Sequence, residues 1–151
     1  MKIISNLFLI LFFLPISFSF AKGNLSSLDL EVWKSPTCEC CNKWIEHLKN
    51  NGFTVTTYNS GNSEIRQKFG INKKFGSCHT AFVNGYVIEG HVPAEDIKNL
   101  LKFKPNALGL AVPGMPVGSP GMDGLEYGAR YDNFDVLLIN KDQSFKVFNS
   151  Y

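Results

Sequence analysis

Three of the four cysteines in this chain lie within four consecutive positions, in the segment Cys38-Glu39-Cys40-Cys41. Before the segment, apolar residues recur at every second position from 28 to 32, a pattern typical of a half-buried strand. After it, apolar residues follow the spacing of one helical face: Cys41, Trp44, Ile45 and Leu48. The segment therefore lies where a strand turns into a helix, and the free N–H groups and dipole of a helix N-terminus favour thiolates.

The first residues have the composition of an export signal. Lys2 gives a positive start, residues 3–20 are largely apolar and uncharged, and Ser19-Phe20-Ala21 supplies small residues at the cleavage spacing. We expect cleavage after Ala21, which makes 1–21 a signal peptide. The apolar run is also about long enough to span a bilayer, so an uncleaved anchor is the alternative. The absence of a basic stop-transfer flank and of a nearby cysteine favours cleavage without a lipid anchor.

Residues 22–151 are expected to form one domain, large enough to bury a core without disulfide support. Loss of Lys2 with the signal lowers the formal net charge from +2 to +1. No basic block or stripe is present, which argues against nucleic acid as a partner. The crowding of three cysteines indicates a functional site, because a disulfide framework usually spreads its cysteines along the chain.

The rest of the sequence predicts an alternation of strands and helices. A strand is expected at 53–58, a short helix at 60–69, and a hairpin with strands 80–83 and 86–89 around Asn84-Gly85, a strong two-residue turn signal. A helix follows Pro93. Residues 102–133 are rich in proline and glycine and are predicted to be a long loop, and 134–149 to be a terminal hairpin.

This order matches the plan of thioredoxins and glutaredoxins. The predicted fold class is α/β, with a thioredoxin/glutaredoxin-like mixed sheet flanked by helices, a long Pro/Gly loop and an added C-terminal hairpin. Cys38-x-x-Cys41 falls where those proteins carry their redox pair, so Cys38 and Cys41 are the candidate catalytic residues. The cis-proline loop of that fold corresponds here to Cys78-His79. The analogy therefore predicts that Cys78 and His79 lie beside the segment Cys38-Glu39-Cys40-Cys41, which we call the cysteine turn.

The chemistry of this residue set permits disulfide exchange or binding of a soft metal. A third thiol, Cys40, would complicate exchange by trapping alternative disulfides. Sulfur with imidazole selects Cu(I), Zn or an iron–sulfur cluster, and the spacing is unlike a paired zinc knuckle. Thiols this close are better suited to bridge several Cu(I) ions, and four Cu(I) charges would balance four thiolates.

Each candidate ligand also has a simpler interpretation. Cys38 and Cys41 can form an ordinary redox disulfide, Cys40 can be a packed thiol, and His79 a hydrogen-bonded residue at a strand start. His91, just before a helix, is as well suited to capping or a surface position as to ligation.

Other residues outside the cysteine turn divide in the same way. His47, in a helix body, is predicted to be a solvated or interface residue. Met115 and Met122 offer soft thioethers in the long loop, or simply pack it onto the domain. Trp44 and the phenylalanines are expected in the core.

Several segments together resemble the CopG-type copper-resistance proteins, a family long described as a domain of unknown function. The resemblance covers nearly the whole mature chain. Its motifs are Ser35-Pro36-Thr37-Cys38-x-Cys40-Cys41, Ser77-Cys78-His79-Thr80, Gly85-Tyr86-Val87-Ile88-Glu89-Gly90-His91-Val92-Pro93 and Gly109-Leu110-Ala111-Val112-Pro113-Gly114-Met115-Pro116. Glu39 stands where the family often has glycine.

The resemblance implies a periplasmic protein with a cysteine-bridged multi-copper cluster that interconverts Cu(I) and Cu(II), a copper oxidoreductase. It implies copper ions as the ligand, a periplasmic copper efflux or oxidase system as partner, and no stable membrane anchor. The metal ligands that the resemblance implies are Cys38, Cys40, Cys41, Cys78, His79 and His91, together with the loop methionines Met115 and Met122. The alternatives are a thiol–disulfide oxidoreductase of exported proteins and a non-enzymatic copper chaperone.

Overall fold

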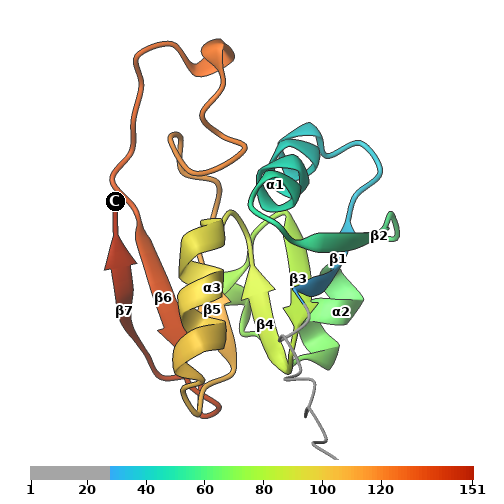
Figure 1. Cartoon of the computed structure of the whole chain (residues 1–151), viewed down its shortest axis with the longest axis vertical. Coiled ribbons are helices and arrows are strands. Elements are labelled where there is room, and N and C mark those ends of the chain that lie inside the picture. The colour runs from blue at the N-terminus through green and yellow to red at the C-terminus, as the bar shows by residue number, and fades with distance from the viewer. Residues whose placement is uncertain (1–27) are drawn as a thin grey trace, which may run out of the picture.

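The computed structural model describes residues 28–151, and the predicted signal peptide, residues 1–21, lies outside the described residues together with 22–27 (Figure 1). The strands are β1 (Asp29–Lys34), β2 (Thr54–Tyr58), β3 (His79–Val83), β4 (Tyr86–Glu89), β5 (Gly109–Ala111), β6 (Asp135–Ile139) and β7 (Phe145–Ser150). The helices are α1 (Glu39–Asn50), α2 (Ser63–Lys68) and α3 (Ala94–Phe103), with the 3-10 turns η1 (Lys73–Phe75) and η2 (Leu125–Tyr127). Within residues 28–151, no helix combines the length and the apolar character needed to cross a bilayer.

All seven strands of the described part join one mixed sheet in the order β2-β1-β3-β4-β5-β6-β7. β1 pairs in parallel with β2, and β4 with β5, whereas the other neighbours are antiparallel. The predicted α/β class with a thioredoxin/glutaredoxin-like mixed sheet is confirmed. The C-terminal hairpin, β6 with β7, extends this same sheet through β5.

The two faces of the sheet carry separate apolar layers, because successive strand residues point to opposite sides. Ala81, Ile88 and Leu110 pack in one cluster with the apolar faces of α1 and α3. Val87 and Ala111 pack on the other face with Ile71 and Phe75, which follow α2. Helices α1 and α3 therefore cover one face, and the α2–η1 segment covers the other (Figure 1).

One element differs from the sequence expectation. The stretch 102–133 was predicted to be a loop without elements, but α3 continues to Phe103 and Gly109–Ala111 form β5. All three β5 residues are buried, so this short strand lacks the apolar–polar alternation that marks a half-buried one. A side chain at Gly109 would place its Cβ 1.7 Å from the Val87 carbonyl oxygen, so glycine permits the close pairing with β4.

Strand pairing brings the distant cysteine to the cysteine turn. Lys34, the last residue of β1, pairs with His79, the first residue of β3, so Cys78 lies at the end of the sheet where Cys38-Glu39-Cys40-Cys41 begins α1. The predicted hairpin turn is present, with positive φ at Asn84 and Gly85. It returns the chain so that the segment after β4 reaches the same end of the sheet.

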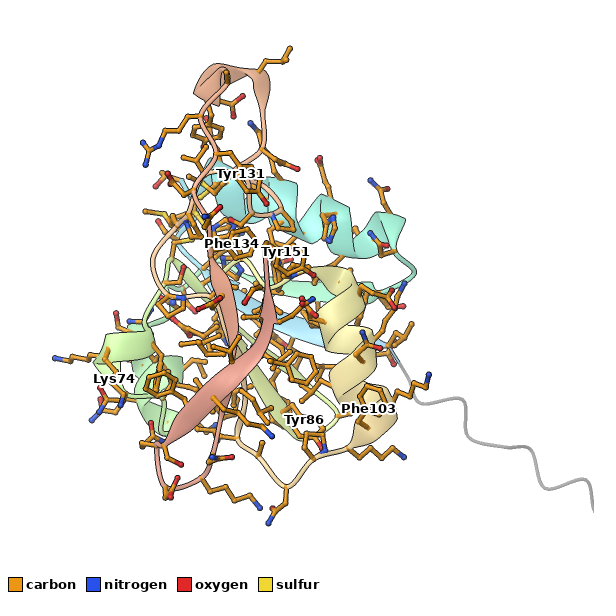
Figure 2. The ribbon with its side chains drawn as sticks, turned by 90° about the vertical axis from the view of Figure 1, so that its left-hand side faces the viewer. Lys74, Tyr86, Phe103, Tyr131, Phe134 and Tyr151 are labelled. Atoms are coloured by element: carbon orange, nitrogen blue, oxygen red, sulfur yellow. A yellow bond between two sulfur atoms is a disulfide. The ribbon has the colours of Figure 1, made fainter. Side chains whose placement is uncertain are left out.

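Tyr151 holds the end of β7 against the start of β6. Tyr151 exchanges two backbone hydrogen bonds with Phe134, and their rings stack with centroids 5.0 Å apart (Figure 2). The Tyr151 hydroxyl also donates to the buried carboxylate of Asp96 on α3, at 2.8 Å. The hairpin is thus fixed to α3, a helix that covers one face of the sheet.

Candidate metal centre

The cysteine turn forms the N-terminus of α1. Cys38 is the N-cap residue, and its sulfur accepts a hydrogen bond from the Cys41 N–H at 3.3 Å. Cys38 and Cys41 form a disulfide, whereas Cys40 and Cys78 are free thiols. The Cys40 sulfur lies 3.5 Å from that of Cys38, so the third thiol adjoins the disulfide.

Cys78 completes a group of four sulfurs. Its Sγ lies 3.4 Å from Cys41 Sγ and 3.9 Å from Cys40 Sγ. All four sulfurs fall within 4.8 Å of one another. We call this group the thiol cluster: Cys38, Cys40, Cys41 and Cys78.

A second group shares Cys78 and adds two imidazoles. Cys78 Sγ lies 3.2 Å from His91 Nε2 and 3.4 Å from His79 Nδ1. One donor atom from each of these residues lies within 4.8 Å of the others, and both histidines are fully buried. We call this group the imidazole cluster: Cys78, His79 and His91. The surface position considered for His91 is therefore wrong, because its side chain is enclosed.

The His91 ring is oriented by the long loop. Its Nδ1 lies 2.9 Å from the carbonyl oxygen of Pro120, which can only accept, so Nδ1 carries the proton. In a neutral ring, Nε2 then presents its lone pair toward Cys78. A backbone carbonyl that fixes the tautomer in this way is the usual support for a metal-binding histidine.

His79 contains an unpartnered polar atom. Its Nε2 is buried and has no hydrogen-bond partner in the part of the chain that the structure describes. The ring packs on Trp44, with centroids 4.2 Å apart, and Trp44 in turn donates from Nε1 to the Val92 carbonyl at 2.9 Å. Buried polar groups are normally paired with protein groups, ordered water or ions, so this nitrogen is an exception among the described residues.

Burial keeps the imidazole cluster uncharged at neutral pH. It lowers the pKa of His79 and of His91, and it raises the pKa of Cys78 to about 12, with the Cys40 thiol adding to the rise. The imidazoles are therefore uncharged, as metal ligation requires. A cation that binds Cys78 must displace a thiol proton, so binding compensates for the buried charge.

The loop between β5 and β6 lies against this site. It extends past the strand ends at the end of the sheet where α1 lies (Figure 1). A Cβ on Gly121 would lie 2.6 Å from the Cys40 carbonyl oxygen and 2.8 Å from the Trp44 nitrogen, so the loop backbone touches α1 directly. Residues 120 and 121 thus join the cysteine turn to His91.

The two methionines occupy different environments in this loop. Met122 is buried, and its sulfur accepts a hydrogen bond from the Tyr127 hydroxyl at 3.3 Å. The Met115 side chain is 51% exposed. Ligation by either methionine stays a prediction.

His47 lies at a helix–helix contact. It is half-buried on α1, and its Nε2 accepts a hydrogen bond from the Ala94 N–H, at the start of α3, at 3.1 Å. The interface alternative is therefore the appropriate description of this residue.

The sequence did not single out the charged residues that surround Cys78. Glu89 is completely buried on β4, where it pairs with Arg66 of α2 and accepts hydrogen bonds from Ser77 and Thr80. Burial raises the pKa of Glu89. A carboxylate in a strand otherwise made of buried residues, directly before Gly90-His91, was the available signal.

Chemically, the arrangement suits a soft cation or disulfide exchange. Four sulfurs and two imidazoles converge on one partly buried region, and Cys78 belongs to both clusters. Sulfur and imidazole donors favour Cu(I) and Zn over hard cations such as Mg²⁺. The Cys78 sulfur is also adjacent to the Cys38–Cys41 disulfide, as attack on that bond would require.

Comparison with known proteins identifies relatives. Residues 75–122 match a family described as a protein of unknown function, DUF411. No curated protein matches the chain. Two solved structures, forms 1 and 2 of a copper resistance protein CopG, are each 40% identical to it. Form 1 has a TM-score of 0.76, with 83% of this chain and 98% of the relative covered. Form 2 has a TM-score of 0.75, with 82% and 97% covered. At this identity over almost the full length of the relatives, the chain belongs to the CopG family of copper resistance proteins.

Proposed function

We propose that this protein binds copper, more than one ion at a time, in the thiol and imidazole clusters, and that it serves copper resistance. The observation that carries the proposal is the shared residue Cys78, whose sulfur approaches both the other thiols and the two histidines. The proposed ligands are Cys38, Cys40, Cys41, Cys78, His79 and His91. The proteins of known structure that resemble the chain are copper resistance proteins.

The donor set suits Cu(I), and the copper resistance proteins among the relatives favour it over zinc. The four sulfurs lie within 4.8 Å of one another, and thiolates this close can bridge Cu(I) ions. His79 Nδ1 and the oriented His91 Nε2, both within 3.4 Å of the Cys78 sulfur, add imidazole donors at the same place. Thiolate charges would offset Cu(I) charges, so a nearly neutral cluster can be buried at low cost.

We further propose that Cys38 and Cys41 are the redox-active pair in an interconversion of Cu(I) and Cu(II). Reduction of one disulfide takes up two electrons, which balances the oxidation of two Cu(I) ions. The coexistence of a disulfide and two free thiols in one cluster supports this proposal. Met115 and Met122 are proposed as additional soft ligands of the loop.

The sequence and the family resemblance support a proposal on the place of action and the partners. We propose that residues 1–21 direct export to the periplasm and are cleaved after Ala21. A copper efflux or copper oxidase system is the proposed partner, since a protein that converts or holds copper must receive it and pass it on.

Metal stoichiometry tests this function. The purified mature protein, fully reduced and titrated anaerobically with Cu(I), is expected to bind more than one ion, with copper–copper scattering in X-ray absorption. Binding of zinc alone, or of no metal, would contradict the proposal. Anaerobic addition of Cu(I) to the protein with its Cys38–Cys41 disulfide intact, followed by electron spin resonance of Cu(II) and thiol counting, tests the redox step: formation of Cu(II) without two new thiols would exclude Cys38 and Cys41 as its partners.

A thiol–disulfide oxidoreductase is the second candidate function, favoured by the Cys38–Cys41 disulfide at a helix N-terminus. Exchange activity that survives Cys40→Ser, Cys78→Ser and His79→Ala would support it over copper. A copper chaperone, the third candidate, would transfer Cu(I) to a partner with no change in oxidation state.

A further inference from the structure

We infer that Arg66 and Glu89 are positioning residues for the proposed copper centre: together they hold the Ser77 peptide and so present the Cys78 sulfur to both clusters. The inference rests on the proposed function, since it concerns the residue that the two clusters share. Neither side chain is a proposed ligand. Their effect on the metal would be transmitted through the backbone.

Side chains hold both backbone polar groups of Ser77, the residue before Cys78. The Ser77 N–H donates to Glu89 Oε1 at 2.7 Å. The Ser77 carbonyl accepts from Arg66 Nη2 and, at 3.2 Å, from Asn62 Nδ2. This segment precedes β3, and Gly114 also contacts it: Gly114 donates to the Gly76 carbonyl and accepts from the Ser77 hydroxyl. The orientation of the Ser77–Cys78 peptide, and with it the direction of the Cys78 side chain, depends on the side-chain hydrogen bonds to the Ser77 carbonyl.

Glu89 joins the segments that carry the imidazoles as well. Its Oε2 accepts from the hydroxyl of Thr80, which follows His79, at 2.5 Å. Glu89 itself ends β4 and is followed by Gly90, whose N–H donates to the His79 carbonyl at 3.0 Å. One carboxylate thus connects the backbone on either side of Cys78-His79 with the strand that leads to His91.

Arg66 supplies the matching charge from outside the sheet. Its Nε lies 2.8 Å from Glu89 Oε1, and the fork geometry of the guanidinium lets a second nitrogen reach Ser77. A lysine has one nitrogen at the end of a flexible chain, so it can offset the charge but does not reproduce the two-nitrogen fork. The pair therefore acts through the planar geometry that arginine provides.

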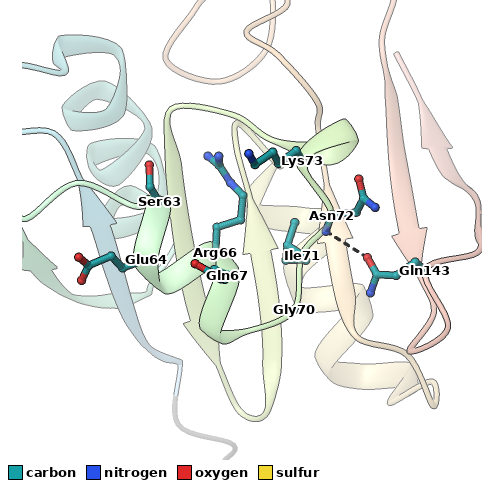
Figure 3. A pocket seen from close by; sticks show the side chains of 9 residues that line it. All are labelled: Ser63, Glu64, Arg66, Gln67, Gly70, Ile71, Asn72, Lys73 and Gln143. Atoms are coloured by element: carbon teal, nitrogen blue, oxygen red, sulfur yellow. Dashed lines mark hydrogen bonds between the residues drawn. The ribbon is translucent and has the colours of Figure 1, made fainter.

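Arg66 is also reachable from solvent. It lines a cavity of about 710 Å³ beside α2, together with Lys73 and Gln143 (Figure 3). Its side chain is 18% exposed, whereas that of Glu89 is fully buried. A shortened residue 66 would leave a space that opens into this cavity, wide enough for a small cation to enter.

The test compares Arg66→Lys with the wild-type protein. Anaerobic titration with Cu(I) against a competing chelator is expected to show affinity about 10- to 100-fold lower in Arg66→Lys, as for other outer partners of metal ligands. X-ray absorption should show fewer sulfur neighbours per copper. Tyr151→Phe is the matched control, because it removes one hydrogen bond to another buried carboxylate, Asp96, outside the clusters. It is expected to bind Cu(I) like the wild type, whatever its thermal stability.

Rescue separates positioning from general damage to the fold. Arg66→Ala is expected to regain Cu(I) affinity in millimolar guanidinium chloride, and not in equal sodium chloride, because guanidinium can occupy the vacated space. Wild-type affinity in Arg66→Lys, or equal losses in Tyr151→Phe, would overturn the inference while leaving the copper function intact. A failure of guanidinium to rescue folded Arg66→Ala would also overturn it. Absence of Cu(I) binding in the wild type would instead refute the copper function.

Discussion

The Cys38-Glu39-Cys40-Cys41 turn and the Ser77-Cys78-His79 segment bring sulfur to the same site, but different interactions hold them there. The turn is organised locally, by the N-cap of α1 and a disulfide between residues three positions apart. The second segment is held by side chains from α2 and β4 and by pairing of β3 with β1. The first half of the site is thus built by sequence neighbours, and the second by the tertiary fold.

This contrast indicates which changes should matter most. The local half can keep its geometry when distant parts of the chain change, because its contacts span one helical turn. The distant half contains the residue shared by both clusters and depends on several elements at once. Substitutions in the second half should therefore lower the Cu(I) stoichiometry or affinity more than substitutions in the first half.

The largest effect is expected from Cys78→Ser. It removes a donor from both clusters and leaves the Cys38–Cys41 disulfide able to form. We expect the Cu(I) stoichiometry to fall to one ion or none and copper–copper scattering to disappear. Cys40→Ser is the comparison in the local half, because Cys40 is also a free thiol but belongs to the thiol cluster alone. If Cys40→Ser lost as much copper as Cys78→Ser, the two halves would be equivalent.

An intermediate effect is expected where the long loop links the halves. Gly121 has φ +87°, and a Cβ there would meet Cys40 and Trp44 backbone atoms within 3 Å. Gly121→Ala should lose about 1–3 kcal/mol from the strained φ, and overpacking should add about 1–3 kcal/mol. The Pro120 carbonyl should also withdraw from His91, which lowers Cu(I) affinity. Urea unfolding and Cu(I) titration measure the two effects.

Gly128→Ala is the control for this variant. Gly128 lies in the same loop with φ +62°, but a Cβ there meets nothing within 4 Å. It should show the strain alone, with wild-type Cu(I) affinity. Equal unfolding free energies for the two variants would mean that the loop does not press on α1.

The smallest effect is expected at the contact between α1 and α3. Burial lowers the pKa of His47 in the folded protein, with Lys98 acting in the same direction and Asp123 opposing. The unfolded chain therefore binds more protons below about pH 6.5, and acidification weakens the fold. Protonation also removes the acceptor for the Ala94 N–H, a loss of about 1 kcal/mol by analogy with helix caps.

His47→Gln removes this titration and keeps an acceptor. Its unfolding free energy should change less between pH 7 and pH 5 than that of the wild type. His79 and His91 are present in both proteins, so the difference isolates His47. Identical pH profiles would show that the α1–α3 contact carries no proton linkage.

Local patterns in the sequence were sufficient for most elements. The helix after the cysteine turn and the Asn84-Gly85 hairpin follow from residue spacing and turn chemistry, and both are present. Strand β5 was missed, since three residues buried on both faces leave no alternation to detect. Its signal depends on the neighbouring strands and not on its own sequence.

The site divides in the same way. The approach of Cys78 and His79 to the cysteine turn was predicted from the analogy of fold, because strand order fixes where β3 begins. The roles of Arg66, Glu89 and Pro120 were not, since each acts through a partner distant in the chain: Arg66 and Glu89 through Ser77, Pro120 through His91. No periodicity or short motif encodes such pairs.

The sulfur–sulfur approaches of Cys78 join residues 37 and 38 positions apart in the chain. An ion held by sulfurs from both segments would therefore act as a reversible cross-link, which closes a long loop in the folded chain. Such a ligand stabilises the fold by an amount that grows with the logarithm of its free concentration, about 2.7 kcal/mol at 100 times Kd. The melting temperature would then rise with free copper, and the protein's resistance to proteolysis in its own compartment would report the local copper supply.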